Sequence, residues 1–308
     1  MSDRDLLHEL ESTVETLLER HLDTTKEWFP HDFVPYSRGR DAVNGQSWTP
    51  ADADLAGAEL DDAVRSSLVV NLLTEDNLPY YFRTIEQVFG ADGPWGTWAR
   101  RWTAEEGRHS MVIYSYLMVT RAVDPVALER ARMVQVSGGL VPQPASAADG
   151  LVYVALQELA TRIAHRNTGK MIGDPAGFEV MKRVAADENL HHLFYRDLVS
   201  AALTVDPSAV MQAIERQVVE FEMPGAGIPD FAQHAAAISR AGIYDLAIHH
   251  DQILAPVVLR HWAIESVEGL DAAGEQARER LVARLVKSER VARRLTDRRQ
   301  RQLASASA

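Results

Sequence analysis

The chain has 308 residues, 46% of them hydrophobic and 25% charged, which fits one large globular domain or two small ones and excludes a disordered or collagen-like chain. It contains no cysteine, so disulfides, iron–sulfur clusters and thiolate nucleophiles are excluded, and any metal must be held by His and carboxylate side chains. The formal net charge of −12 argues against binding to nucleic acid or to an anionic membrane, because both need a basic surface.

No segment has the pattern of a membrane span or of a secretion signal. The longest apolar candidate, residues 111–120, falls well short of the roughly 20 residues that a membrane-spanning helix needs. The N-terminal residues carry charges throughout and lack the apolar stretch of a signal peptide. The sequence therefore predicts a cytoplasmic protein with no membrane span.

Apolar residues recur at helical spacing along most of the chain, and no stretch alternates long enough to build a sheet, so the sequence predicts an all-α fold. Apolar residues between positions 6 and 17 mark a first short helix that packs on the domain. Residues 29–54 contain three prolines and two glycines and are expected to cross the domain irregularly. Four long helices with apolar stripes are then predicted over residues 60–89, 95–121, 149–170 and 176–203.

The connections between these helices favour a four-helix bundle. Two of them are short, whereas a long stretch rich in Gly, Pro and Ser, SGGLVPQPASAADG, joins the second helix to the third. A helix from Pro207, the loop MPGAGIPDF and a helical stretch over residues 244–267 are expected to complete a single domain, residues 1–270. Residues 271–308, the C-terminal tail, carry ten Lys and Arg against five Asp and Glu. They are predicted to form an exposed basic helix with a partly disordered end.

Two of the predicted helices carry a Glu-x-x-His pair, a spacing that places both side chains on one helical face where they can bind the same metal ion. The second helix holds Glu106 and His109, and the fourth holds Glu188 and His191. Chance alone gives about one such pair in a chain of this composition, so the spacing by itself is weak evidence for a metal site and the position of each pair in its helix must be considered. Each pair lies in the apolar stripe of its helix, where an unpaired carboxylate would cost several kcal/mol. Both pairs are therefore candidate metal ligands.

The other two helices each carry a single Glu in an apolar stripe. Glu75 precedes Glu106 by 31 residues and Glu158 precedes Glu188 by 30, which suggests two copies of one helical hairpin. Such hairpins would bring four carboxylates and two imidazoles together, the ligand set of a ferritin-like dinuclear site, and these ligands suit iron or manganese. For each Glu taken singly, a buried salt bridge to an Arg or a wrongly assigned helix face is the alternative interpretation.

Around these residues the chain resembles the soluble acyl-acyl-carrier-protein desaturases, the fatty acid desaturases of plant plastids and actinobacteria. The resemblance covers about residues 15–270 and is looser over HDQILAPVVLRHWAIESVEG. Four segments carry it: TEDNLP around Glu75, RWTAEEGRHS around Glu106 and His109, LQELATRIAHRNTG around Glu158, and AADENLHHLFY around Glu188 and His191. The tail has no counterpart in the family that we can assign.

The resemblance implies a ferritin-like four-helix bundle core with additional flanking helices. It also implies a site for two Fe²⁺ ions per subunit. In that site the terminal ligands are Glu75 and Glu158, the bridging ligands are Glu106 and Glu188, and the nitrogen ligands are His109 and His191.

Three further residues match catalytic positions of the family. Thr161, one turn after Glu158, matches a threonine beside the oxygen-binding face of the irons, although a Thr that bonds to its own helix gives the same pattern. Trp28 and Asp187 match the proposed electron route from a Trp through an Asp to a ligand His. For Trp28 alone, packing in the core is the alternative interpretation.

Two other residues bear on the same site. Pro79 cannot donate the hydrogen bond that would reach the carbonyl of Glu75, so the first bundle helix is expected to kink there. His165 shares a helical face with Glu158. A third imidazole ligand occurs in some related N-oxygenases, but we expect His165 to support the site or to pack in the core.

The resemblance implies an oxygen-dependent desaturase that introduces a cis double bond into a saturated fatty acyl chain. Acyl carrier protein would present the chain, reduced ferredoxin would supply electrons, and the enzyme would be a homodimer. Because acyl carrier protein is acidic, an Arg-rich surface is expected to receive it despite the net charge of −12. Chain length and double-bond position stay open.

Three other functions compete with this one. The same irons could serve another diiron oxygenase, such as a hydroxylase or an N-oxygenase, because only the substrate decides the outcome. A ribonucleotide reductase small subunit would carry a radical Tyr one turn beyond the first ligand His, where this chain has Ile113. A non-catalytic homologue that binds iron or an acyl carrier is disfavoured by the complete set of six ligands.

Overall fold

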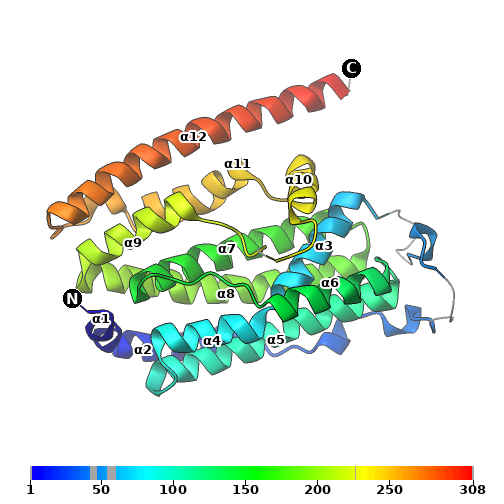
Figure 1. Cartoon of the computed structure of the whole chain (residues 1–308), viewed down its shortest axis with the longest axis horizontal. Helices are drawn as coiled ribbons and strands as arrows, with labels where there is room; N and C mark the ends of the chain where they lie inside the picture. Colours follow the sequence, from blue (N-terminus) through cyan, green and yellow to red (C-terminus); the bar gives the residue numbers. More distant parts are fainter. Residues whose placement is uncertain (1, 42–46, 54–59, 226, 307–308) are drawn as a thin grey trace.

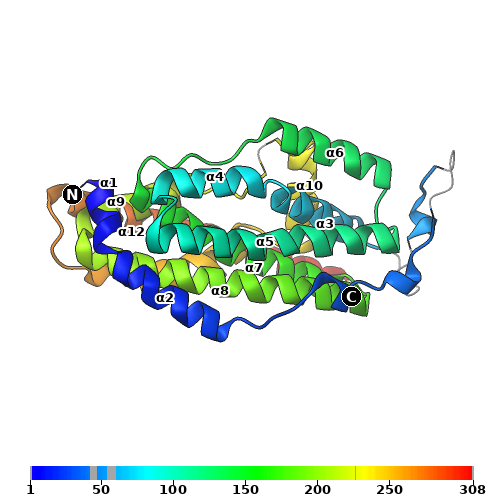
Figure 2. The ribbon, with the colours of Figure 1, turned by 90° about the horizontal axis from the view of Figure 1, so that it is seen from below.

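The computed structural model describes residues 2–41, 47–53, 60–225 and 227–306. Every regular element in this part of the chain is helical, which confirms the all-α prediction (Figure 1). Three long helices, α5 (Gly93–Thr120), α7 (Ala147–Met171) and α8 (Pro175–Val205), lie side by side (Figures 1 and 2). Two shorter helices in line, α3 (Asp62–Glu75) and α4 (Leu78–Phe89), form the fourth member of the bundle. Among the described residues, no helix is both long and apolar enough to cross a membrane.

The segment predicted as one helix over residues 60–89 is two helices. The kink expected near Pro79 is a complete break, because α3 ends at Glu75 and Pro79 lies in the first turn of α4. Pro is well tolerated there, since the first amide groups of a helix have no partner within it. The break therefore places a predicted metal ligand at a helix end.

Contacts with a helix that the sequence did not predict, and with the chain just beyond it, hold this break in place. The guanidinium of Arg132 on α6 (Pro125–Gly138) donates to Asp76 over 2.6 Å. The buried amide of Asn77 donates to the backbone carbonyl of Leu140, just beyond α6, over 2.9 Å. Helix α6 has a weak apolar pattern because only Leu128 and Gln135 are buried in it, which explains why periodicity missed it.

The first predicted helix consists of two pieces, α1 (Asp3–Glu9) and α2 (Glu11–Thr24), joined at Leu10. Buried leucines on both pieces join the main core, so the prediction that this segment packs on the domain is confirmed. The irregular crossing that follows contains three short 3₁₀ turns, within residues 30–52, and parts of it lie outside the described residues.

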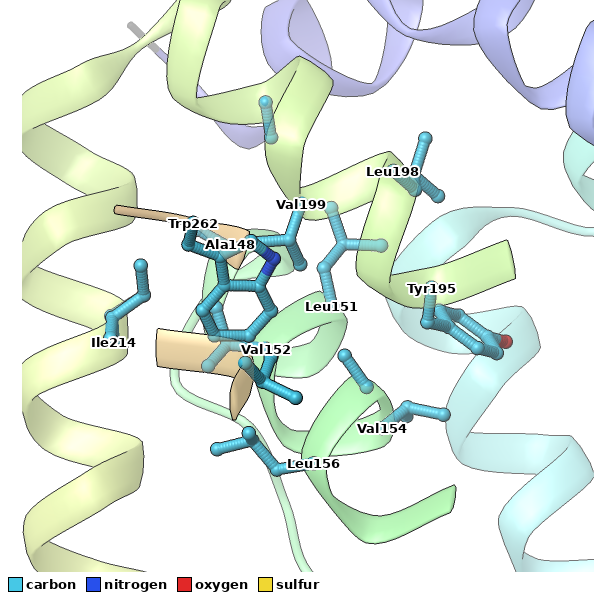
Figure 3. Packing of buried hydrophobic residues seen from close by; sticks show 14 of the residues in the cluster. Ala148, Leu151, Val152, Val154, Leu156, Tyr195, Leu198, Val199, Ile214 and Trp262 are labelled. Atoms are coloured by element: carbon cyan, nitrogen blue, oxygen red, sulfur yellow. The ribbon is translucent and has the colours of Figure 1, made fainter. Parts of the chain in front are cut away.

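The chain beyond the bundle adds flanking helices. The predicted helix from Pro207 is α9 (Pro207–Glu220), and the loop after it leads into α10 (Phe231–Ala241), which was not predicted. The last predicted stretch begins as α11 (Leu246–His249) and continues as a π-helix, η4 (His250–His261). The residue after η4, Trp262, is buried among side chains of α7, α8 and α9 (Figure 3).

The tail forms α12 (Ala272–Ala306), which packs along α9 and α11 (Figure 1). The expectation of an exposed helix is wrong for one face of it, because Ala277, Leu281 and Leu285 are buried in the main core. These residues recur every four positions between charged side chains, so a prediction from charge alone overlooks them.

The buried imidazole of His249 gives the fold an acid-sensitive contact. Its Nδ1 lies 2.8 Å from the hydroxyl of Tyr244, and its ring stacks on Phe221 with centroids 4.7 Å apart. Burial, with a smaller effect of the neighbouring His250, lowers the pKa of His249 from 6.5 to about 4. The folded state therefore resists protonation that the unfolded chain accepts, so stability is full above pH 6.5 and falls as the pH decreases towards 4.

We predict that His249→Asn reduces this loss, since the Asn amide oxygen can accept from Tyr244 without titrating. Urea unfolding of the wild type between pH 7 and pH 5 should lose about 2 kcal/mol more than that of the variant. Equal losses in the two proteins would contradict the assignment.

Candidate metal centre

The six residues predicted as metal ligands lie together inside the bundle, each with at most 6% of its surface exposed. They are Glu75 at the end of α3, Glu106 and His109 on α5, Glu158 on α7, and Glu188 and His191 on α8. Helices α5 and α8 each contribute a Glu and a His three residues apart, and α3 and α7 each contribute one Glu. All of them lie on the inward faces of their helices, as the apolar stripes predict. We call this set the carboxylate cluster.

Two of the carboxylates lie between the two imidazoles. The Nδ1 of His109 is 3.2 Å from Glu106 Oε2 and 3.4 Å from Glu188 Oε1. On the other side, the Nδ1 of His191 is 2.8 Å from Glu106 Oε1. Both imidazoles therefore turn Nδ1 towards the carboxylates that lie between them.

The possible ligand atoms form two overlapping groups, within each of which all atoms lie within 4.8 Å of one another. The His109 group consists of Glu75, Glu106, His109 and Glu188, and the His191 group consists of Glu106, Glu158, Glu188 and His191. Glu106 and Glu188 belong to both groups, whereas Glu75 and Glu158 each belong to one. This overlap is the arrangement that two ions with two bridging carboxylates require.

The donor set fits divalent metal ions. Glu106 Oε1, Glu158 Oε2 and His191 Nδ1 are buried and have no hydrogen-bond partner, although the imidazole nitrogen lies 2.8 Å and 3.6 Å from the two oxygens. Buried polar atoms without partners are rare in folded proteins, and a cation would satisfy all three. Four carboxylates also balance the charge of two divalent ions, and oxygen with imidazole ligands suits iron or manganese.

Without a cation, the charges in the cluster compete with one another. Burial and the neighbouring charge of Glu188 raise the pKa of Glu158 well above its usual range, and the same two causes raise the pKa of Glu106. Burial opposes a charged His191, yet its contacts with acidic neighbours raise its pKa well above the usual range. Metal ions must displace these protons, so we expect metal uptake to release protons and to weaken in acid.

The predicted electron route is continuous in space. The indole nitrogen of Trp28 donates to Asp187 Oδ2 over 2.7 Å, and that oxygen lies 3.5 Å from Nε2 of His109. The guanidinium groups of Arg108 and Arg183 lie over the Trp28 ring, 4.8 Å and 5.6 Å from its centroid. Trp28 is buried, but its polar end reaches a residue next to the cluster, so packing alone does not account for its position.

The structure adds two residues that the sequence analysis missed, Glu105 and His21. Glu105 Oε2 lies 2.9 Å from Nε2 of His191 and 2.9 Å from Nε2 of His21. A signal for Glu105 was present, because an acidic residue directly precedes the ligand Glu in both Glu-x-x-His pairs. No local pattern pointed to His21, which comes from α2 and meets the cluster only through tertiary folding.

Thr161 and His165 on α7 both contact the cluster. The hydroxyl of Thr161 lies 2.8 Å from Glu188 Oε2 and 3.0 Å from the carbonyl of Glu158, so its one hydrogen can serve either. His165 is buried, and its Nε2 lies 3.1 Å from Glu75 Oε1. It belongs to neither ligand group, in agreement with the expected supporting position.

A cavity between α4 and α7 opens onto the cluster. It holds about 720 Å³ of space, part of it open to solvent. Its walls are mostly apolar and include Leu78, Ile85, Phe89 and Val154, while the cluster contributes four carboxylates. Tyr81 and Tyr153 also line the cavity, as do the uncharged polar residues Thr74, Thr84 and Gln157. Burial raises the pKa of both tyrosines, so they stay neutral.

Over residues 2–308 the chain matches the family described as fatty acid desaturase. It is 43% identical over 291 residues to a protein of Mycobacterium tuberculosis with the provisional name acyl-[acyl-carrier-protein] desaturase DesA1, an alignment covering 91% of this chain and 84% of that protein. It is 32% identical over 317 residues to the chloroplastic acyl-[acyl-carrier-protein] desaturase 7 of Oryza sativa subsp. indica, covering 96% and 77%.

Its fold is similar to the X-ray structure of DesA2 from Mycobacterium tuberculosis H37Rv, with a TM-score of 0.70 and 28% sequence identity. The superposition covers 89% of this chain and 99% of that one. The family match thus includes the tail, which the sequence motifs did not cover. The chain belongs to the fatty acid desaturase family, as its motifs predict, and is a desaturase enzyme.

Proposed function

We propose that the protein is an oxygen-dependent acyl-[acyl-carrier-protein] desaturase that introduces a cis double bond into a saturated fatty acyl chain at a carboxylate-bridged diiron site. The proposed metal ligands are the six residues of the carboxylate cluster, with Glu106 and Glu188 bridging. The proposed catalytic residues are Thr161, Asp187 and Trp28.

The observation that carries this proposal is the apolar cavity that opens onto the cluster. A saturated acyl chain has no polar group along its length, so apolar walls can hold it while the only charged groups lie at the metal ligands. An amine substrate would need a polar partner along its length, and the cavity wall offers mainly alkyl and aromatic surface. The cavity therefore favours a desaturase over an N-oxygenase.

The side chains around the cavity would hold the chain still and exclude water. Leu78 and Ile85 on α4 and Val154 on α7 line the cavity, and these walls would position two neighbouring methylenes next to the ligands. When bound, the two irons would activate dioxygen. Overall, the reaction consumes one dioxygen, two electrons, two protons and two hydrogens of the substrate, and it yields two waters and the alkene. Thr161 would hold a proton 2.8 Å from Glu188 Oε2.

Trp28 and Asp187 are the proposed entry for electrons, with ferredoxin as the donor. Arg108 and Arg183 are half-buried beside Trp28 and both pair with Asp187, so the two guanidinium groups and the one carboxylate leave a net positive charge at this part of the route. Positive charge at this position suits an acidic electron-transfer partner. We further propose that acyl carrier protein delivers the chain and that the enzyme is a homodimer.

The test is a reaction of iron-loaded protein with reduced ferredoxin, air and stearoyl- or palmitoyl-acyl carrier protein, followed by mass spectrometry of the acyl chain. Loss of two hydrogens would support the proposal. An added oxygen would assign a hydroxylase instead, and an unchanged chain together with reoxidised iron would exclude these acyl chains as substrates. A Glu106→Ala protein treated in the same way controls for chemistry without the site.

A further inference from the structure

Each imidazole of the carboxylate cluster faces a second carboxylate on its outer side. The Nε2 of His191 shares a hydrogen bond with Glu105, and the Nε2 of His109 faces Asp187. Each outer carboxylate directly precedes a shared Glu, and each faces the imidazole of the opposite helix. The two halves of the site thus have the same plan.

One N-terminal segment supplies the next partner on both sides. Trp28 donates to Asp187 over 2.7 Å, and His21, seven residues earlier on α2, lies 2.9 Å from Glu105. Helix α2 contacts both α5 and α8, and Figure 2 shows it running along them. The family resemblance assigns a role to Trp28 and none to His21.

The contacts of His21 fix both its position and its tautomer. Its ring stands edge-on to the Trp98 ring, with the centroids 5.0 Å apart, and stacks on the His191 ring, with the centroids 5.8 Å apart. Glu105 Oε2 accepts from the Nε2 atoms of both rings, so each ring carries its hydrogen on Nε2. With one hydrogen held on Nε2, Nδ1 of His191 is the nitrogen that faces the cluster, and it is the atom whose proton a metal ion would displace.

We propose that His21 is a positioning residue, which acts through Glu105 to hold His191 with Nδ1 towards the metal. This inference rests on the proposed function, because it assumes that His191 binds a metal ion. Arg101 also approaches Glu105, 2.5 Å from Oε1, but it leaves Oε2 to the two imidazoles. Without the donor of His21, Oε2 can turn away from His191 and the imidazole loses its orientation.

His21, Glu105 and His191 are also close enough together to hold a metal ion of their own. The guanidinium of Arg101 already balances the charge of Glu105, which disfavours a further cation there. We therefore assign the group to positioning, and the test includes a third metal ion as an outcome that would overturn this.

The experiment compares three substitutions of His21 by cobalt(II) titration, with the visible spectrum and the metal content as readouts. The amide nitrogen of Gln lies at the position of the imidazole Nε2 and can still donate to Glu105. The amide of Asn is one bond too short, and Leu has no donor. We expect His21→Leu and His21→Asn to weaken binding of one of the two ions about 10- to 100-fold, and His21→Gln to restore it.

Trp28→Phe is the matched control, because it removes the donor to the other outer carboxylate. We expect it to disturb the ion at His109, which gives a cobalt spectrum different from that of His21→Leu. Thermal melting of the metal-free proteins shows whether each variant folds.

Four outcomes would count against the inference. Unchanged cobalt affinity in all three His21 variants would show that His21 does not position His191. Equal losses in the Leu, Asn and Gln variants would show a packing role only. A third cobalt ion in the wild type that every His21 variant lacks would assign a separate metal site. A wild type that binds no metal would refute the proposed function itself.

Discussion

Alanine at Glu106 or Glu188 should abolish binding of both metal ions, whereas alanine at Glu75 or Glu158 should abolish binding of one. The reason is the overlap of the two ligand groups, which share the first two carboxylates and divide the other two between them. Desaturation should fall at least about a thousandfold in all four variants, since each loses a ligand of a metal that the reaction needs. Metal content per chain separates the two classes.

Isosteric Gln variants at the same four positions keep the volume of the side chain and control for collapse of the bundle. Circular dichroism should show unchanged helix content in them. If Glu106→Ala and Glu75→Ala retained the same number of ions, the bridging assignment would be wrong. Full metal content in every variant would refute the site.

Leucine at Gly150 should shorten the acyl chain that the enzyme prefers. Gly150 lines the cavity from α7, and an added Cβ would lie 3.1 Å from Phe89 Cζ and 3.2 Å from Val88 Cγ1. Both neighbours are themselves cavity-wall residues and must shift to admit the new side chain, so the leucine and the displaced wall together should take the space of two or three methylenes of the substrate. At about 0.8 kcal/mol for each buried methylene, kcat/KM should fall about 30-fold for a long chain relative to a shorter one.

Acyl carrier proteins loaded with chains that differ by two and four carbons provide the measurement. Gly138→Leu is the control, because no atom lies within 4 Å of a Cβ added there and the position is outside the cavity. An unchanged preference in Gly150→Leu, with normal metal content, would show that the acyl chain does not occupy this cavity.

Most of the metal cluster could be predicted from the sequence because its ligands obey a local rule. A polar residue in an apolar helical stripe must lie in the interior, and the spacing of Glu106 and His109 places both on one face. The regular interval from Glu75 to Glu106 and from Glu158 to Glu188 then joined the helices into one site. These features need no knowledge of how the helices pack.

What the sequence did not reveal depends on contacts between distant segments. His21 lies in a helix whose charged residues resemble a solvated surface, and its partner Glu105 is 84 positions away. The buried face of α12 also depends on distant contacts, with α9 and α11. Its apolar residues, such as Ala277, stand among charged ones, so the local pattern indicates an exposed helix. Periodicity also failed to separate an α-helix from the π-helix that begins at His250.

The break between α3 and α4 separates two tasks that a continuous helix would combine. Glu75 ends α3, whereas α4, from Leu78 to Phe89, builds one wall of the cavity. Contacts from α6 and Leu140 fix the joint itself, so neither helix needs the other to set its direction. Substitutions along α4 can therefore reshape the substrate cavity while the metal ligand stays in place, and new chain-length preferences can evolve or be engineered there without loss of the metal centre.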